Sequence, residues 1–438
     1  MEDGSEALRW LFSLADQERG VGWNPRASPE AQWRLGRTRA LLDIAGAPDA
    51  RLRIALVAGS KGKGSTCAML ASILGAAGTR CGLYTKPHLQ SYRERIRIDG
   101  QAIPPRAFEA AVGRMQPHVA TLRQDFPDAG EPTTFEVTTA VALDEFARRG
   151  CEVAVVEVGL GGRLDATNAV EPTASVITPI SYDHTAILGR TLGAIAREKA
   201  GILRRGRPAI VASQRPAAMR ALARACGEVG AACQVVGPFE PARELALIGA
   251  HQQQNAALAV AAAHVIARVD DEAIERGLSR VHWPGRFEVL GGIPPVILDG
   301  AHNGASAEAL AATLVAFAAG RPVLLVVGIN RDKDARAVLR PLLPIAHAVW
   351  TTQARHNPRA LPATDLGRLV ARSPRARRPR SKDTQLRETN VRAEMGSALE
   401  AASAAAIRDG GVVCVTGSLL LVGQARASLG LPAPEQLW

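Results

Sequence analysis

The sequence has few aromatic residues and no long apolar run. Only 4% of its 438 residues are Phe, Trp or Tyr, which argues against binding of single-stranded nucleic acid by base stacking. No apolar stretch reaches about 18 residues without a charge or a Gly or Pro break, so we expect no membrane span. The opening residues, MEDGSEALRW, lack the basic-then-apolar order of a signal peptide. Together these absences predict a cytoplasmic protein.

Cysteine is also scarce, and no two cysteines form a CxxC pair. The six cysteines stand at positions 67, 81, 151, 226, 233 and 414. Four of them lie in apolar runs of the kind that form strands or helices. Buried reduced thiols therefore fit the sequence better than disulfides or a zinc site.

What is present is the composition of a soluble globular protein, with 47% apolar and 22% charged residues. The length allows two or three domains. The net charge of +11 is compatible with nucleic acid, a membrane surface or small polyanions such as nucleotides as partners. The strongly basic run at 372–380, RSPRARRPR, is expected to be a solvated surface loop rather than a nucleic-acid patch.

Short β-branched runs alternate with longer Ala- and Leu-rich segments along the chain, which is typical of doubly wound, mostly parallel α/β sheets. The strands are expected at Arg53–Ala58, Cys81–Tyr84, Glu152–Val158, Ala174–Thr178, Pro208–Ala212, Val296–Asp299, Pro322–Val327 and Val412–Thr416. Helices are expected, among others, at Gly64–Ala77, Thr134–Arg149, Asn255–Arg268, Ala305–Ala318 and Glu394–Arg408.

A stretch rich in Gly and Pro, WPGRFEVLGGIPP, interrupts this alternation, and a fresh strand–helix alternation follows it. We interpret it as a linker between two domains. The larger domain is expected at residues 1–283, the linker at 284–294 and a smaller α/β domain at 295–438.

A glycine-rich loop, AGSKGKGSTC at 58–67, follows the first apolar strand and opens a helix. It approximates the Walker pattern with a shorter spacer. Glycines permit a tight turn, and the amides of such a loop point at phosphate oxygens. Lys63 supplies a cation for the β- and γ-phosphates, and the Ser65 hydroxyl suits Mg²⁺. The loop therefore predicts nucleotide binding by Ser60, Lys61, Gly62, Lys63, Gly64 and Ser65.

This loop and the motifs after it resemble the folylpolyglutamate synthase/dihydrofolate synthase family of the Mur-ligase superfamily. The motifs are YTKPHL (84–89), ERIRI (94–98), TTFE (133–136), EVGLGGRLDATN (157–168), DH (183–184), REKAGI (197–202), PGRF (284–287) and LDGAHN (298–303). Weaker agreement continues through GINRDKD (328–334), NPRA (357–360) and VTGSLLLVGQAR (415–426).

The resemblance implies an ATP-dependent amide ligase. ATP phosphorylates a carboxylate of dihydropteroate or of a folate, and the amine of L-glutamate then attacks the acyl phosphate. It implies a phosphate-loop domain followed by a Rossmann-like glutamate-ligase domain. It also implies ATP and one or two Mg²⁺ ions as cofactors, only small molecules as partners, and a monomer.

Within the resemblance, Lys63, His184 and Lys199 are the expected catalytic residues. Glu157 ends an apolar strand at its carboxyl end, where α/β sheets place their sites, and a carboxylate suits a hard cation. The family uses Glu157, His184 and Ser65 positions as metal ligands. The Lys199 position is a carbamylated lysine in the family, which requires an amine with a lowered pKa.

The remaining expected site residues contact ATP or the pterin. Asn255, Arg286, Asp299 and His302 match nucleotide contacts, and domain closure over them would exclude water from the acyl phosphate. The pterin side corresponds to Thr133, Thr134, Phe135, Glu136, Leu164, Asp165 and Ala166. There we expect Phe135 to offer a flat apolar face and Glu136 or Asp165 to accept a hydrogen bond from the pterin.

Two lysines depart from the family pattern. Lys61 stands where the family usually has Asn, and Lys86 stands where it usually has a Ser that binds the first Mg²⁺. An ammonium has three donors and no acceptor, so it cannot bind a metal ion. Two alternatives therefore stay open: a Mur-type ligase that acts on a different acid, and a nucleotide- or nucleic-acid-binding protein without ligase activity.

Overall fold

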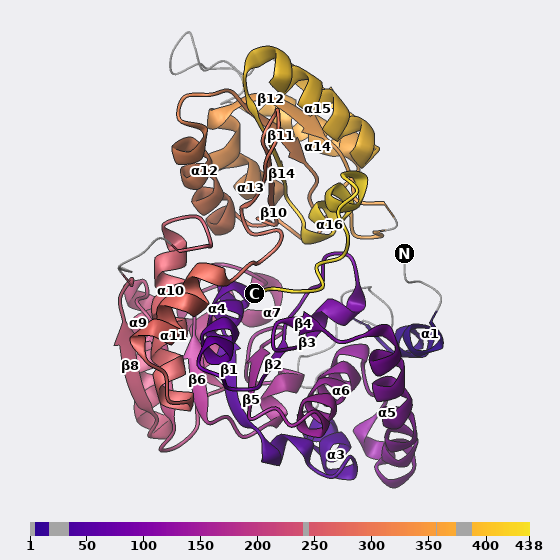
Figure 1. Ribbon diagram of the computed structural model, residues 1–438, viewed down its shortest axis with the longest axis vertical. Coiled ribbons are helices and arrows are strands. Elements are labelled where there is room, and N and C mark those ends of the chain that lie inside the picture. The colour runs from indigo at the N-terminus through magenta and orange to yellow at the C-terminus, as the bar shows by residue number, and fades with distance from the viewer. Residues whose placement is uncertain (1–4, 17–34, 240–244, 356, 374–387) are drawn as a thin grey trace.

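The computed structural model describes residues 5–16, 35–239, 245–355, 357–373 and 388–438. Two α/β domains lie one above the other in Figure 1, each built around one sheet. This confirms the predicted fold class. In the part of the chain that the structure describes, no helix has the length and apolarity needed to cross a lipid bilayer.

The first sheet has eight strands in the order β4-β3-β2-β5-β1-β6-β7-β8. From β2 to β8 all neighbours are parallel, and β3 and β4 add an antiparallel edge. The strands are β1 Arg53–Ala58, β2 Cys81–Tyr84, β3 Ile96–Ile98, β4 Gln101–Ala102, β5 Val153–Glu157, β6 Ala174–Ile177, β7 Pro208–Ala212 and β8 Ala232–Val236.

Helices cover both faces of this sheet. Along β1, Ile54, Leu56 and Ala58 join the core with α3, α5, α6, α8 and α9, whereas Ala55 and Val57 join the core with α4, α10 and α11, because side chains alternate across a strand. The helices are α1 Glu6–Ser13, α3 Leu35–Ile44, α4 Lys63–Ala76, α5 Pro105–Asp125, α6 Thr134–Arg148, α7 Thr185–Leu188, α8 Leu192–Ala200, α9 Pro216–Val229, α10 His251–Ile266 and α11 Asp271–Arg280.

The second sheet has six strands in the order β13-β12-β11-β14-β10-β9, and only β9 is antiparallel to its neighbour. The strands are β9 Glu288–Leu290, β10 Val296–Asp299, β11 Val323–Val327, β12 Ala346–Thr351, β13 Glu388–Val391 and β14 Val412–Thr416. The helices are α12 Gly304–Ala318, α13 Ala335–Leu342, α14 Ala363–Arg372, α15 Met395–Asp409 and α16 Leu419–Ser428. The first three of these pack on one face, and α15 and α16 pack on the other.

Each of the eight expected strands forms, and five of them have the expected bounds. Most of the unexpected strands are short or lie at a sheet edge, where one side is open and the apolar run is weak. In β8, for example, four of the five residues are exposed. The strand β12 differs, because its six residues pair on both sides and are largely buried. Of the basic run at 372–380, Arg372 ends α14, and residues 374–380 lie outside the described residues.

One expectation about cysteine was wrong. Cys226 at the end of α9 and Cys233 in β8 form a disulfide. The turn between them places Gly230 at a φ of 74°, which returns the chain beside the helix end and brings two thiols seven residues apart together. The other four cysteines are free and buried, as expected, and burial raises the pKa of the Cys67 thiol.

The second domain begins earlier and ends earlier along the chain than the expected bounds of 295 and 438. The segment expected as a linker contains β9, which pairs with β10. At the other end, residues 434–438 return to the first domain, where Leu437 joins the core beside α4 and Ala102 N donates to Glu435 O. Figure 1 shows this end beside α4. Two segments therefore connect the domains.

Candidate active site

A cavity of about 540 Å³ lies where the two domains meet. It is lined by the glycine-rich loop after β1, by the carboxyl ends of β5 and β6, and by the start of the second domain. Open α/β sheets place their sites at the carboxyl ends of the strands. The lining includes all the expected metal, catalytic and ATP-site residues, namely Ser60, Lys61, Gly62, Lys63, Gly64, Ser65, Glu157, His184, Lys199, Asn255, Arg286, Asp299 and His302.

The backbone of the loop is held in a narrow space. Gly59 and Gly62 have φ values of 152° and 81°, and a Cβ on Gly62 would overlap the side-chain oxygen of Asn255. Only glycine fits both conditions. Asn255 is itself buried and donates to Gln252 Oε1 at 2.8 Å. The loop leads into α4 at Lys63, so the first amides of the helix are available to an anion.

Lys63 and Glu157 face each other across the floor of the cavity. The Lys63 ammonium donates to Gly59 O at 3.2 Å and lies 4.0 Å from Glu157 Oε1. Glu157 ends β5 and its Oε2 accepts the Lys86 amide at 3.2 Å. Burial raises the pKa of Glu157, and the positive charges of Lys63 and Lys86 oppose this rise.

Glu157 and Ser65 fit a magnesium ion that also binds phosphate oxygens. Both side chains line the cavity and offer hard oxygen ligands. Among the described residues no group of three or more His, Cys, Asp and Glu side chains is arranged to hold a metal by itself. A metal ion here would therefore depend on ligands from the nucleotide or from water.

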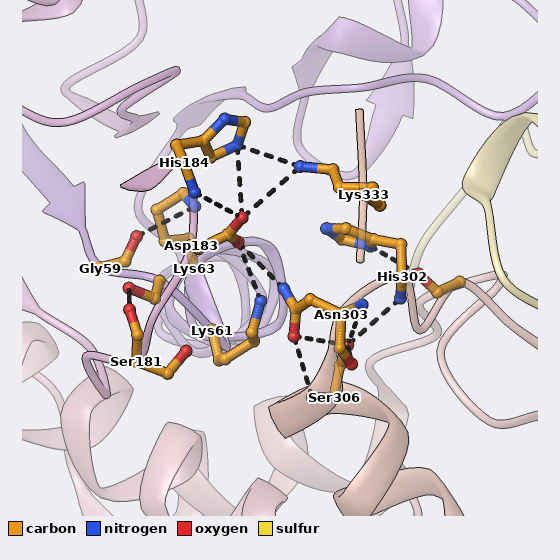
Figure 2. Close-up of polar contacts among 12 residues, drawn as sticks. Gly59, Lys61, Lys63, Ser181, Asp183, His184, His302, Asn303, Ser306 and Lys333 are labelled. Carbon is orange, nitrogen blue, oxygen red and sulfur yellow. Dashed lines mark hydrogen bonds and ion pairs between the residues drawn. The ribbon is translucent and has the colours of Figure 1, made fainter. Parts of the chain in front are cut away.

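Asp183 forms a second polar centre, drawn in Figure 2. Its Oδ2 accepts Lys61 Nζ at 3.0 Å from the first domain and Asn303 Nδ2 at 2.9 Å from the second. Its Oδ1 lies 3.5 Å from Lys333 Nζ, also of the second domain. Burial acts to raise the pKa of Asp183, but Lys61 and the other neighbouring cations hold it well below its usual range.

The two histidines of the site lie beside this centre. His184 Nε2 lies 3.4 Å from Lys333 Nζ, and burial together with Lys333 lowers the pKa of His184. His302 Nδ1 lies 2.8 Å from Gly300 O, and burial, with Lys61 and Lys333 next, lowers the pKa of His302 to about 3. Both imidazoles are therefore neutral near pH 7.

Lys199 of α8 reaches the loop from the other side. Its side chain is buried, and Nζ donates to Gly59 O at 2.9 Å. Burial, and then the positive charge of Lys63, lower the pKa of Lys199 to about 7. About half of these side chains are therefore neutral amines near pH 7.

Arg286 and Asp299 bring the second domain to the cavity. Asp299 ends β10, and its carboxylate accepts the amides of Phe287 and Ala301, each at 2.8 Å. Burial raises the pKa of Asp299, and Arg286 opposes this. The carboxylate thereby holds the segment that carries Arg286, whose guanidinium donates to Gly285 O at 3.1 Å.

The seven residues expected on the pterin side do not line this cavity. Glu136 forms a two-pronged ion pair with Arg37, at 2.7 and 2.9 Å, and caps α6 through the Thr133 amide. Asp165 accepts the Leu160 amide at 2.7 Å and the Thr167 hydroxyl at 2.6 Å. Their carboxylates therefore hold the protein's own backbone and side chains.

Among the seven residues expected on the pterin side, Phe135 contacts a residue of the cavity lining, Lys86. The Lys86 ammonium lies 5.4 Å from the centroid of the Phe135 ring, and this ring stacks on Tyr84 with centroids 6.0 Å apart. Lys86 lines the cavity. An apolar ring pair and a cation thus stand side by side at this edge of the site.

Sequence reasoning missed Asp183, Asn303 and Lys333 as site residues. All three lie in motifs that were recognised, DH, LDGAHN and GINRDKD. Asn303 and Lys333 follow Asp183 by 120 and 150 positions, however, and no local pattern indicates that both contact its carboxylate. Arg37 was also missed, since only the folded chain places it against Glu136.

Comparisons with known proteins find matches to both domains. The family model of the Mur ligase middle domain matches residues 57–231, and that of the Mur ligase glutamate ligase domain matches residues 285–419. A Mycobacterium tuberculosis protein named dihydrofolate synthase/folylpolyglutamate synthase is 35% identical over 443 residues, covering 90% of both chains.

Solved structures show the same similarity. The M. tuberculosis folylpolyglutamate synthase complexed with ADP and AMPPCP superposes with a TM-score of 0.84 at 32% identity, covering 92% of this chain and 97% of that one. The Escherichia coli FolC complex with DHPP and ADP has a TM-score of 0.83 at 31% identity and covers 98% of both chains.

Some relatives are longer. A Halobacterium salinarum protein named probable bifunctional folylpolyglutamate synthase/dihydropteroate synthase is 39% identical over 393 residues, and this chain covers 46% of its length. The identity and coverage across both domains decide the family. The chain belongs to the folylpolyglutamate synthase/dihydrofolate synthase family, whose members are ATP-dependent ligases with Mur ligase domains.

Proposed function

We propose that this chain joins L-glutamate to dihydropteroate and to folates, using ATP and an acyl-phosphate intermediate. The observation that carries the proposal is the interdomain cavity, in which the glycine-rich loop and Glu157 of the first domain face Arg286, Asp299 and His302 of the second. A ligase that makes a reactive acyl phosphate needs such a site, because closure around it excludes water.

In the first step the acid's carboxylate oxygen bonds to the γ-phosphorus of ATP, and the bond from that phosphorus to the β-phosphate bridging oxygen breaks, releasing ADP. The loop amides and Lys63 hold the phosphates, and Arg286 neutralises charge from the linker side. Ser65 and Glu157 would hold a magnesium ion, which supplies charge neutralisation at phosphate oxygens. We propose Asn255, Asp299 and His302 as further nucleotide contacts.

In the second step the amine of L-glutamate attacks the acyl carbon, phosphate leaves, and the amine loses a proton. The imidazoles of His302 and His184 have lowered pKa values and are therefore weak bases, so we propose that the departing phosphate or water takes this proton. His184 was expected as a metal ligand. Its contact with the Lys333 ammonium disfavours both protonation of the ring and a divalent cation at Nε2.

We propose that Lys199 is carbamylated, because a neutral amine is the form that reacts with CO₂ and the pKa of Lys199 is lowered to about 7. The carbamate would carry a negative charge beside Lys63. Mass spectrometry of protein prepared in bicarbonate should show loss of one CO₂ on acidification. A Lys199→Met variant should show no such loss, and an unmodified wild-type chain would refute the modification.

On the acid side we propose that Phe135, with Tyr84 and Lys86, flanks the pterin, and that Thr133, Thr134, Leu164 and Ala166 shape its surroundings. Glu136 and Asp165 would support that pocket through their own hydrogen bonds. We further propose that the chain acts as a cytoplasmic monomer on small molecules, without nucleic-acid or membrane partners. Light scattering of the purified protein tests the oligomeric state.

The deciding experiment is phosphate release by purified protein with Mg²⁺ and ATP. We expect release with L-glutamate and either dihydropteroate or tetrahydrofolate, and none when either the acid or glutamate is omitted. Release with only one of the two acids would show that the enzyme accepts that acid and not the other. Release with neither acid would favour a Mur-type ligase for a different acid, and nucleotide binding without any turnover would favour a binding protein.

A further inference from the structure

Asp183 lies between two ammonium groups that come from different domains. Its two oxygens lie 3.0 Å from Lys61 Nζ and 3.5 Å from Lys333 Nζ. The same Oδ2 also accepts Asn303 Nδ2 at 2.9 Å. Lys333 Nζ has a second carboxylate partner, Asp332 Oδ2, at 3.7 Å. Two ammonium groups thus contact Asp183 next to the phosphate loop, as Figure 2 shows.

We propose that Lys61 supplies, in this chain, the positive charge that a second divalent cation would otherwise supply to the nucleotide, so that the nucleotide complex holds one metal ion. The proposal rests on the proposed function in one respect, that the loop binds ATP. It extends that function by stating which positive charges accompany the bound nucleotide: one metal ion and the Lys61 ammonium.

The surroundings of Asp183 and His184 do not suit a second metal ion. Both carboxylate oxygens already face ammonium or amide donors, and His184 Nε2 lies 3.4 Å from Lys333 Nζ. An ammonium offers a metal no lone pair, and a divalent cation here would meet two like charges at close range. At Glu157 the situation differs, because the Lys63 ammonium lies 4.0 Å from Oε1, beyond hydrogen-bond distance.

Lys61 is placed so that its ammonium can turn from Asp183 to a phosphate. Its backbone is held on both sides, since its amide donates to Pro179 O at 3.1 Å and its carbonyl accepts the Thr178 hydroxyl at 2.6 Å. It lies inside the glycine-rich loop and lines the cavity. When Lys61 turns away, Lys333 and Asn303 still contact the Asp183 carboxylate, so that buried negative charge keeps its partners.

The test counts metal ions. Full-length protein saturated with AMPPCP is titrated with Mn²⁺, and free Mn²⁺ is followed by electron paramagnetic resonance. We expect one Mn²⁺ per nucleotide in the wild type and in Lys61→Arg, which keeps the charge. The double variant Lys61→Asn/Lys333→Gln, which removes both ammonium groups from Asp183 and His184, should bind two, whereas Lys333→Gln alone, which keeps Lys61, should bind one. Arg224→Asn on the exposed face of α9 serves as the control and should bind one.

A second readout does not depend on counting. The ratio of the ADP dissociation constants with EDTA and with Mg²⁺ should rise about tenfold in the double variant relative to Lys333→Gln, because a second ion replaces the lost charge-assisted contact of Lys61 only when Mg²⁺ is present. The ratio should stay near the wild-type value in Lys61→Arg.

Two Mn²⁺ ions in the wild type would overturn the inference even if a variant failed to fold, and so would an unchanged count and ratio in the double variant Lys61→Asn/Lys333→Gln. Failure of the wild type to bind AMPPCP at all would instead overturn the proposed ATP-dependent function, and the inference with it.

Discussion

At the scale of single residues, the site is governed by lysines whose charges are held by few partners. Lys63 and Lys199 both donate to the carbonyl oxygen of Gly59, and Lys61 and Lys333 share Asp183. Burial of such groups is costly unless each is paired or neutral. Their carboxylate contacts are shared or long, as for Lys63 at 4.0 Å from Glu157, so nucleotide phosphates would add counter-charge, and replacement of one lysine should affect turnover more than stability.

Lys63→Ala should reduce kcat about 10²–10³-fold, because one cation of the transferring phosphoryl group is lost. The measurement is steady-state phosphate release with dihydropteroate and L-glutamate. Arg224→Ala, on the exposed surface of α9, should match the wild type. Near-normal kcat in Lys63→Ala would contradict the assignment of the phosphate loop.

Lys199 should make stability depend on pH. Its folded-state pKa is about 7, against an ordinary value of 10.5, so between these pH values the unfolded chain binds a proton that the folded chain has released. The free energy of unfolding therefore gains a contribution that rises with pH in this window.

Urea unfolding of the wild type and of Lys199→Met, in CO₂-free buffers at about pH 7 and about pH 10, measures this contribution. We expect the stability of the wild type to rise relative to that of Lys199→Met toward the higher pH. A difference that stays constant with pH would show that the pKa of Lys199 is not lowered.

At the scale of elements, a loop of the first domain is held between both domains. The Glu94 carboxylate accepts the amides of Leu89, Gln90 and Ser91 at 2.9, 2.8 and 2.7 Å, which holds the loop after β2 in place. On the other side Arg426 of α16 forms a buried ion pair with Glu288 and donates to Gln90 Oε1 at 2.9 Å. Lys86 belongs to this loop, so α16 helps to set one wall of the cavity.

Gly423→Ala tests this contact, since a Cβ at Gly423 of α16 would overlap the carbonyl oxygen of Leu89. Overpacking against backbone should destabilise the protein by roughly 1–3 kcal/mol, seen as a lower Tm. Gly113→Ala is the matched control, because it lies in α5 with open space around it and should stabilise by about 0.5–1 kcal/mol. Equal effects of the two substitutions would contradict close packing of α16 on the loop.

At the scale of the whole molecule, the segment 431–438 ties the second domain back to the first. The guanidinium of Arg97, which is 2% exposed, donates to Pro434 O at 2.5 Å and to Glu435 O at 3.0 Å. Leu437 N donates to Gly100 O, and its side chain is buried. Together with the connection near Arg286, this segment restricts how far the domains separate, and so limits opening of the cavity.

Deletion of residues 434–438 should destabilise the chain by about 3 kcal/mol or more, because a buried leucine is lost and Arg97 is left with unpaired donors. Arg97→Met should then recover about 1–3 kcal/mol in the shortened chain while destabilising the full chain. Urea unfolding of all four proteins measures this cycle. A loss from Arg97→Met of equal size in both backgrounds would show that the guanidinium does not hold the segment.

Several features could be predicted from sequence because their causes are local. Continuous apolar runs such as Arg53–Ala58 and Val412–Thr416 are buried on both faces wherever they pair, so the runs alone indicate the strands β1 and β14. The glycines around Lys63 indicate the phosphate loop, since only glycine adopts the turns it needs. The capping role of Glu136 is equally local, because Thr133 precedes it by three residues.

The sequence by itself therefore determined the family, the fold class and many of the residues that line the cavity, because short-range patterns of burial and backbone freedom encode them. Only the tertiary structure decided how distant residues share partners. Asp183 bridges Lys61, Asn303 and Lys333, Cys226 bonds to Cys233, and Arg97 holds the 434–435 backbone. Such contacts depend on how sheets, turns and domains pack. Packing brings together side chains that are far apart along the chain, and no local sequence pattern indicates that they will meet.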